Sequence, residues 1–218
     1  MGSPSPAPRW TRLEHDERRE QILTCARRLF SERGYADVST TEIAAEAGVA
    51  RGLLHHYFGT KRDLYAEVVR TMVRLPPPLP DADVAARPIT DILDVTIHRW
   101  LGMVSRHRQT WFAAVGAEGG LGGDPEIEKI LEDAREEVVD RWVTILASRR
   151  PDATAEVEPE LRAAIRSHIA LAEAATREWL QRERLTRAQA HTLITRSMLV
   201  LIDDIVPSLV RDAAPKTA

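Results

Sequence analysis

The chain has 218 residues, of which 44% are hydrophobic and 29% are charged, and its formal net charge is −3 at pH 7. This composition is typical of an ordinary soluble globular protein. It contains no run of about 18 apolar residues, which argues against a membrane span, and the first ten residues lack the apolar core of a signal peptide. A single cysteine, Cys25, excludes an internal disulfide and leaves the redox compartment open, and the cytoplasm is the default expectation.

The amino-terminal part of the chain predicts a short tail followed by a helix. Residues 1–15 begin with a segment rich in proline, serine and glycine, and we expect them to form a flexible tail. The first helix is predicted from about Asp16 to Arg33, with apolar residues such as Ile22 and Phe30 on one face. Gly34 is predicted to end this helix as its C-terminal cap.

The next segment predicts two short helices joined by a sharp turn. Ser39 and Glu42 have the spacing of a capping box, which opens a helix over about residues 40–47. Gly48 permits the turn at little steric cost. The second helix is predicted over about residues 50–58, with Leu54 and Phe58 pointing inward. This arrangement is typical of a helix-turn-helix.

The same segment, from about residue 18 to residue 69, resembles the DNA-binding signature of the TetR family of transcriptional regulators. The resemblance covers less than a third of the chain, but many positions agree in order and spacing. The matching residues are Gly34-Tyr35, Ser39-Thr40, Ile43-Ala44, Ala47-Gly48-Val49, Arg51-Gly52, Leu54, His56-Tyr57-Phe58, Lys61 and Leu64.

The resemblance implies a DNA-contacting surface around the second helix, with double-stranded operator DNA as the partner. The expected DNA-binding residues are Thr40, Arg51, Gly52, Leu53, His55, His56, Tyr57 and Lys61. Of these, Thr40, Tyr57 and Lys61 occupy phosphate-contacting positions of the family, and the others lie at the groove. An arginine can bind guanine O6 and N7 through two hydrogen bonds, which suits Arg51 to base reading.

Three positions depart from the family pattern. Ala50 stands where a capping serine is common, and Leu53 replaces a polar residue. Leu53 either contacts a thymine methyl group or is inert. His55 replaces a usual tyrosine and either donates to DNA or, like His56, is a solvated surface group. Residues near Arg9 and Trp10 are either part of the solvated tail or an arm close to the minor groove.

The remaining residues predict further helices in a second domain. A helix at residues 61–74 links it to the helix-turn-helix domain, 16–74, and the prolines that follow place the boundary there. The second domain, 75–218, is expected to bind an effector and to dimerise. Its helices are predicted over about residues 88–107, 110–118, 125–145, 159–182 and 187–209, with Asp124 as the cap of the third, so the fold class is all-α.

The last two helices carry broad apolar stripes and many small residues, which favours packing against a second copy as a four-helix bundle. The alternative is that they only fill the core of their own subunit. The predicted homodimer contacts are Ala172, Ala175, Trp179, Ile194, Met198, Leu201 and Ile205.

Four of the five tryptophans lie in the second domain, and the family resemblance implies a site there for a small lipophilic effector. Helical ligand pockets combine apolar walls with a few polar groups. The candidate effector-binding residues are Trp100, Met103, Trp111, Phe112, Val115, Trp142 and His168. Each of them is alternatively a plain core residue.

No Gly-rich phosphate loop, HExxH motif or GxSxG motif occurs in the chain. We therefore expect no catalytic residues, no metal site and no cofactor, and an all-helical enzyme is the weaker alternative. The main hypothesis is a transcriptional repressor that an effector releases from a palindromic operator. A second alternative is a DNA-binding dimer without an effector.

Overall fold

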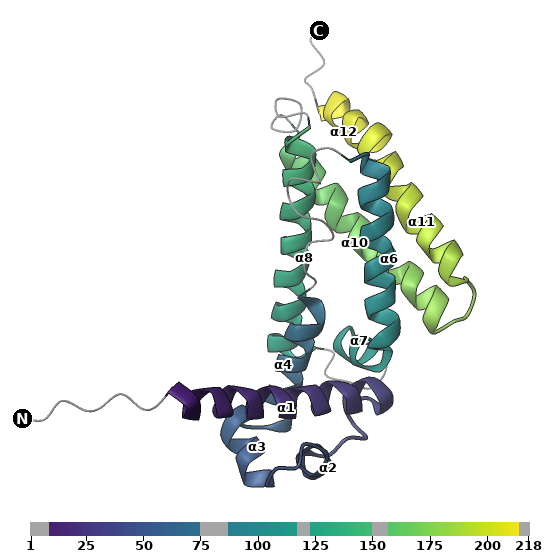
Figure 1. The fold of residues 1–218 in the computed structure, drawn as a ribbon. Helices are drawn as coiled ribbons and strands as arrows, with labels where there is room; N and C mark the ends of the chain where they lie inside the picture. Colours follow the sequence, from purple (N-terminus) through teal and green to yellow (C-terminus); the bar gives the residue numbers. More distant parts are fainter. Residues whose placement is uncertain (1–8, 75–86, 117–122, 150–156, 214–218) are drawn as a thin grey trace, which may run out of the picture. The chain divides into compact units, whose positions relative to one another are not determined.

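The computed structural model describes residues 9–74, 87–116, 123–149 and 157–213. Every regular element in these ranges is a helix (Figure 1), which confirms the all-α prediction. The helices are α1 (Arg9–Arg33), α2 (Thr40–Glu46), α3 (Arg51–Phe58), α4 (Lys61–Val73), α6 (Ile89–Arg106), α7 (Arg108–Ala114), α8 (Pro125–Ala147), α10 (Glu158–Leu180), α11 (Arg187–Val200), the π-helical turn η1 (Leu201–Ile205) and α12 (Val206–Ala213).

The chain folds into two compact units. The first contains α1 to α4, α7 and the start of α8 as far as Ile130. The second contains α6, the remainder of α8, and α10 to α12. The predicted domains divide the chain near Arg74, whereas in the structure a second segment, residues 107–130, also belongs to the first unit. The prolines at positions 76–80 lie outside the described residues.

Helix α1 begins at Arg9, earlier than the predicted start near Asp16, so part of the expected tail is helical. The physical reason is that no proline or glycine interrupts the chain between Arg9 and Arg33. The predicted end of the helix is confirmed. Gly34 has φ +80°, and its N–H donates to the carbonyl oxygen of Phe30 at 3.1 Å.

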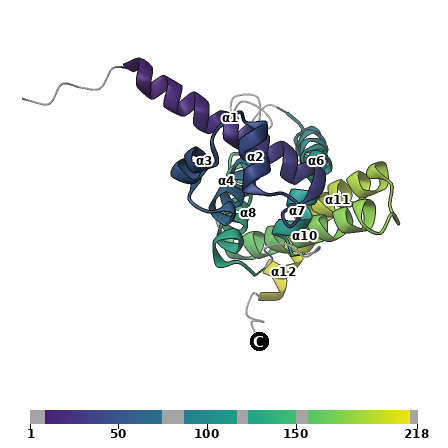
Figure 2. The same ribbon diagram turned by 90° about the horizontal axis from the view of Figure 1, so that it is seen from below.

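The core of the first unit forms where α1 packs against α2 and α4. Ile22 and Phe30 on α1 are fully buried, as is Tyr65 on α4. The rings of Phe30 and Tyr65 meet edge to face with centroids 5.1 Å apart, and the ring of Tyr35 lies 4.9 Å from that of Tyr65. Figure 2 shows α2 and α3 beside α1, where this core supports them.

Helix α7 is held in the first unit by hydrogen bonds that the local sequence pattern does not predict. The hydroxyl of Tyr65 donates to the carbonyl oxygen of Thr110 at 2.9 Å. The hydroxyl of Ser31 lies 2.9 Å from Nδ1 of His107, just before α7 begins. These contacts explain why the segment groups with α1 and α4 and not with the second unit.

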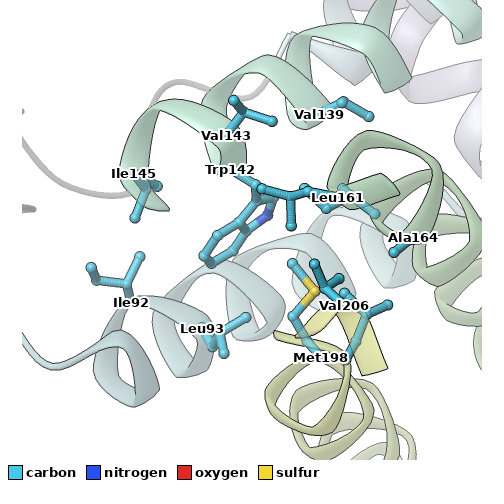
Figure 3. Close-up of a cluster of buried hydrophobic side chains, with 12 residues drawn as sticks. Ile92, Leu93, Val139, Trp142, Val143, Ile145, Leu161, Ala164, Met198 and Val206 are labelled. Carbon is cyan, nitrogen blue, oxygen red and sulfur yellow. The ribbon is translucent and has the colours of Figure 1, made fainter. Parts of the chain in front are cut away.

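The second unit is built around two apolar clusters. Trp142 of α8 lies inside the larger cluster, among Ile92 and Leu93 of α6, Leu161 of α10 and Met198 of α11 (Figure 3). The smaller cluster is formed by buried residues of α6, α10 and α11. These residues are Ile97, Leu101, Ala172, Ala175 and Ile194.

The last predicted helix, 187–209, is interrupted in the structure. Helix α11 ends at Val200, a π-helical turn covers Leu201–Ile205, and α12 follows. A capping box opens α11: the Thr186 hydroxyl accepts from the N–H of Gln189 at 3.1 Å, and the Gln189 side chain accepts from the N–H of Thr186 at 2.8 Å. The π-helical turn rotates the apolar stripe about the helix axis, so regular α-helical spacing assigns the residues beyond this turn to the wrong face.

Candidate nucleic-acid interface

The start of α2 is formed by the Ser39 cap that the sequence predicts. Ser39 has an extended backbone, and its hydroxyl accepts a hydrogen bond from the N–H of Glu42 at 3.1 Å. The other half of the predicted capping box is absent among the described contacts, because the Glu42 carboxylate pairs with Arg33 of α1 instead. Glu42 therefore attaches α2 to α1.

The turn between α2 and α3 has the predicted glycine. Gly48 has φ +62°, a conformation that favours glycine, and the N–H of Val49 donates to the carbonyl oxygen of Ala44 at 2.9 Å. Helix α3 begins at Arg51, and Ala50 precedes it without a side-chain cap. This start agrees with the predicted one at about Ala50.

Helix α3 buries one face and exposes the other. Leu54 and Phe58 are buried, as predicted, which fixes the rotation of the helix about its axis. The exposed side consists of Arg51, Gly52, His55 and His56, and Leu53 and Tyr57 are half-buried at its edges. The ring of Tyr57 packs edge to face on His15 of α1, with centroids 4.5 Å apart.

A hollow of about 460 Å³ lies beside the exposed side of α3. Four of the predicted DNA-binding residues line it: Thr40, Arg51, His55 and Lys61. The other four predicted residues, Gly52, Leu53, His56 and Tyr57, are not in its lining. The remaining lining residues were not among the predicted DNA-binding residues, although Ser39 was predicted as a helix cap; they are Ala36, Asp37, Val38, Ser39 and Thr60.

Thr60 could have been found, because Thr60 and Asp63 have the same spacing as Ser39 and Glu42. The Thr60 hydroxyl accepts from the N–H of Asp63 at 3.1 Å, and the Asp63 carboxylate accepts from the N–H of Thr60 at 3.0 Å. The N–H and the hydroxyl of Thr60 both donate to the Asp63 carboxylate, and these hydrogen bonds lower the pKa of the Asp63 carboxyl. They also hold the N-terminus of α4 at the hollow, where a helix dipole favours anions.

Lys61 is half-buried and its ammonium group lies 4.3 Å from the centroid of the Tyr35 ring. Burial lowers the pKa of this lysine, and the charge of Asp37 opposes that shift. A cation over an aromatic face is stabilised by the ring electrons. Lys61 therefore has a packing role in the first unit in addition to any contact with a phosphate.

Arg51 and His55 of α3 are joined through the imidazole ring of His55. Arg51 Nε lies 3.3 Å from Nε2 of His55, and Nδ1 of His55 lies 2.6 Å from the carbonyl oxygen of Gly59. Gly59 ends the helix with φ +73°, and its N–H donates back to the His55 carbonyl oxygen at 2.9 Å. Arg51 and His55 are thus held together on the exposed side of the helix.

Arg62, on the first turn of α4, anchors that helix to the start of α8. Its guanidinium donates two hydrogen bonds to Asp124, at 2.5 and 2.7 Å, and one to Glu126 at 2.9 Å. The hydrogen bonds from Arg62 lower the pKa of the Asp124 carboxyl. Asp124 also caps α8, as predicted, by accepting from the N–H groups of Glu126 and Ile127.

Comparison with known families agrees with this geometry over both units. Residues 22–68 match "Bacterial regulatory proteins, tetR family", and residues 89–201, more than half of the chain, match "Tetracyclin repressor-like, C-terminal domain". The chain belongs to the TetR family.

Individual TetR relatives are similar over the first unit. The regulator HbdR of Aromatoleum sp. (strain CIB) is 49% identical over 49 residues, which are 22% of this chain and 21% of HbdR. The regulator AcrR of Shigella flexneri is 45% identical over 60 residues, 28% of either chain. The chain therefore spans only a fifth to a third of the length of these relatives.

A solved TetR-family regulator from Streptomyces coelicolor is similar along almost the whole chain. The two share 27% sequence identity with a TM-score of 0.66, and the match covers 90% of this chain and 88% of the other. Regulators of the TetR family bind DNA operators and dimerise. The resemblance deduced from the helix-turn-helix residues is thus confirmed at the level of family and fold.

The predicted TetR effector residues do not fall in one compact unit. Trp111, Phe112 and Val115 belong to the first unit, and the rings of Trp111 and Phe112 meet edge to face at 5.1 Å. The other four predicted residues, Trp100, Met103, Trp142 and His168, belong to the second. Aromatic content alone does not distinguish a ligand wall from a core, so the sequence could not separate the two sets.

Within the second unit, two of the candidate effector-binding residues, Trp142 and His168, make contacts inside the protein. Trp142 packs in the larger apolar cluster. His168 is buried, its Nε2 lies 2.9 Å from the carbonyl oxygen of Ile194, and burial lowers its pKa. Trp100 is half-buried against the smaller cluster. These positions agree with the core alternative for Trp142 and His168.

The predicted dimer contacts lie mostly inside the subunit. Ala172, Ala175, Ile194, Met198 and Leu201 are buried in its own clusters, which agrees with the alternative that they fill the core. Of the other two, Trp179 is half-buried and Ile205 is exposed. The large exposed apolar residues of α11 to α12 are instead Leu193, Val200, Ile205 and Leu209.

Over the described ranges, no helix is long and apolar enough to cross a membrane. In the same ranges, no group of three or more His, Cys, Asp and Glu side chains is placed to hold a metal ion.

Proposed function

We propose that this TetR-family chain is a transcriptional regulator that binds operator DNA through the exposed side of α3. The observation that carries the proposal is the placement of Arg51 and His55 on that side, beside a hollow that also includes Thr40 and Lys61. Groups that read base edges and groups that meet phosphate are thereby close together, which sequence-specific binding requires.

Phosphate contacts would come from the helix N-termini at the hollow. Ser39 precedes α2 and Thr60 precedes α4, and both line the hollow together with the first residues of these helices, Thr40 and Lys61. Backbone N–H groups and the positive end of the helix dipole favour a phosphate there. Such contacts set the register, and Arg51 is the candidate for reading a base.

Operator binding by a homodimer follows from the size of the site, because one helix of this length reads only a few base pairs. We assign the subunit interface to the exposed apolar residues of α11 to α12 and not to the buried ones. Leu193 and Val200 are seven residues apart and share a face. Because π-helical hydrogen bonds join residues five apart, Ile205 follows Val200 after about one turn.

Release by a small lipophilic effector is the second part of the proposal. An effector shifts the protein between two states only if it binds them with different affinity. We place its site in the second unit, near the half-buried Trp100, since Trp142 and His168 already serve the core and Met103 is buried as well. Thermal-shift screening with lipophilic compounds tests this part of the proposal. If the protein is a DNA-binding dimer without an effector, no compound should both raise its unfolding temperature and weaken operator binding.

The test of DNA binding is selection of bound fragments from the source genome by the purified protein, followed by footprinting. We expect a palindromic footprint with half-sites about one helical turn apart. Binding that is equal on all fragments, or no binding at low ionic strength, would refute sequence-specific regulation. A catalytic function has no support from the relatives, which are named as regulators.

A further inference from the structure

The contacts of His55 determine where the proton of its imidazole lies. Arg51 Nε can only donate, and the carbonyl oxygen of Gly59 can only accept. At 3.3 Å and 2.6 Å, both contacts are satisfied only if Nε2 accepts from Arg51 and Nδ1 carries the proton that is donated to Gly59. The structure therefore requires the neutral imidazole, in its Nδ1–H form.

Gly59 provides a well-defined acceptor for this hydrogen bond. Its φ of +73° turns the chain out of the helix, and a Cβ atom at this position would lie 2.9 Å from Oδ2 of Asp63. The carboxylate of Asp63 is itself held by Thr60. The carbonyl oxygen of Gly59 thus depends on a backbone conformation that other residues adopt only with strain.

Arg51 is anchored through Nε, a nitrogen that it does not need for reading a base. A two-bond contact with guanine can be made by the terminal nitrogens of an arginine. Among the described residues, no hydrogen bond or ion pair engages the terminal nitrogens of Arg51; its contact is through Nε, to His55. The anchored side chain has less conformational entropy to lose when it binds DNA.

We infer that His55 is a positioning residue for Arg51: Nε2 of its ring accepts from Arg51 Nε and holds the guanidinium ready for base reading. This inference rests on the proposed DNA-binding function. The other charged groups lining the same hollow are Asp37, from the segment before α2, and Lys61, at the start of α4.

The experiment measures Kd for the selected operator and for a variant operator changed at the base pair where Arg51→Ala loses its preference. His55→Phe keeps a ring but removes both hydrogen bonds. We expect the ratio of the Kd for the variant operator to the Kd for the selected operator to fall by about three- to tenfold. Affinity for non-specific DNA should change by less. His98→Phe, at an exposed histidine of α6 in the second unit, is the matched control and should leave the ratio unchanged.

His55→Gln adds the readout that a purely structural role would not move, because its amide oxygen can still accept from Arg51. The ratio of His55→Gln should stay close to that of the wild type. In the free protein, the ¹⁵N shifts of the His55 ring should show the Nδ1–H form. Thermal unfolding of each variant establishes that it is folded.

Full discrimination in a folded His55→Phe protein would overturn the inference and leave the proposed function intact. An Nε2–H ring, or the same loss of discrimination in His55→Gln as is expected for His55→Phe, would do the same. Failure of the wild-type protein to bind any genomic fragment would instead refute the proposed function, and the inference with it.

Discussion

The hydroxyl of Tyr65 on α4 donates a hydrogen bond to the carbonyl oxygen of Thr110 on α7, at 2.9 Å. The side chain of Tyr65 is fully buried, and burial raises the pKa of its hydroxyl. A hydroxyl removed from water needs a partner, and Thr110 supplies it. This bond joins two helices of the first unit that are far apart in the sequence.

Tyr65→Phe should therefore destabilise the protein while leaving the packing of the ring unchanged. Loss of one buried hydrogen bond of this kind lowers the free energy of unfolding by about 1 kcal/mol. Urea unfolding monitored by circular dichroism measures the change. Tyr35→Phe is the matched control, because no described hydrogen bond involves the Tyr35 hydroxyl; an equal loss in both variants would contradict this account.

Because Arg62 forms an ion pair with Asp124, the free energy of unfolding should depend on pH in the acidic range. The guanidinium lowers the pKa of Asp124 below its ordinary value of 3.8, so the ion pair stabilises the fold above that pH. Its contribution is lost as the pH falls through the lower, folded-state pKa. Asp124→Asn removes the charge but keeps an N-terminal capping side chain.

Unfolding of wild type and Asp124→Asn in urea, at a series of pH values, measures this contribution. The stability difference should be constant near neutral pH and should shrink below about pH 4. A difference that does not vary with pH would mean that the charge of Asp124 is not what stabilises α8 against α4.

Arg51→Ala should relax sequence preference at one base pair of the operator. A two-bond contact between arginine and guanine contributes about 1–3 kcal/mol of discrimination. Binding titrations against operators changed one position at a time identify that base pair. Arg184→Ala, at an exposed arginine just before α11, is the control. Equal loss of affinity on every sequence would show that Arg51 contacts phosphate only.

Val200→Glu should separate the subunits without unfolding them, because Val200 is 49% exposed on the proposed interface. We expect monomers by light scattering and weaker operator binding. Thr144→Glu, at an exposed position of α8, should remain dimeric. Dimers of Val200→Glu at all concentrations would place the interface elsewhere.

A complementary substitution tests the distinction between core and interface on the same helix. Met198 is only 1% exposed in the larger apolar cluster. Met198→Ala should lower the free energy of unfolding by about 2–5 kcal/mol, as other large-to-small core changes do. The folded fraction should remain dimeric. Dissociation without loss of stability would mean that Met198 faces the partner subunit.

The sequence by itself determined the features that depend on neighbouring residues. The cap at Ser39, the turn at Gly48, the buried pair Leu54 and Phe58, and the cap at Asp124 were all predicted from local spacing. These features arise from hydrogen bonds and side-chain contacts within one or two helical turns. The same local pattern carried the resemblance to the TetR family.

Tertiary structure decided which apolar faces become core and which side chains meet across the fold. A helical stripe predicts that α11 has an apolar side, but burial of Met198 and exposure of Val200 depend on how α6 and α10 pack against it. The hydrogen bond from Tyr65 to Thr110 likewise joins residues 45 positions apart. Such contacts depend on the path of the whole chain, because periodicity describes one helix and packing needs its neighbours.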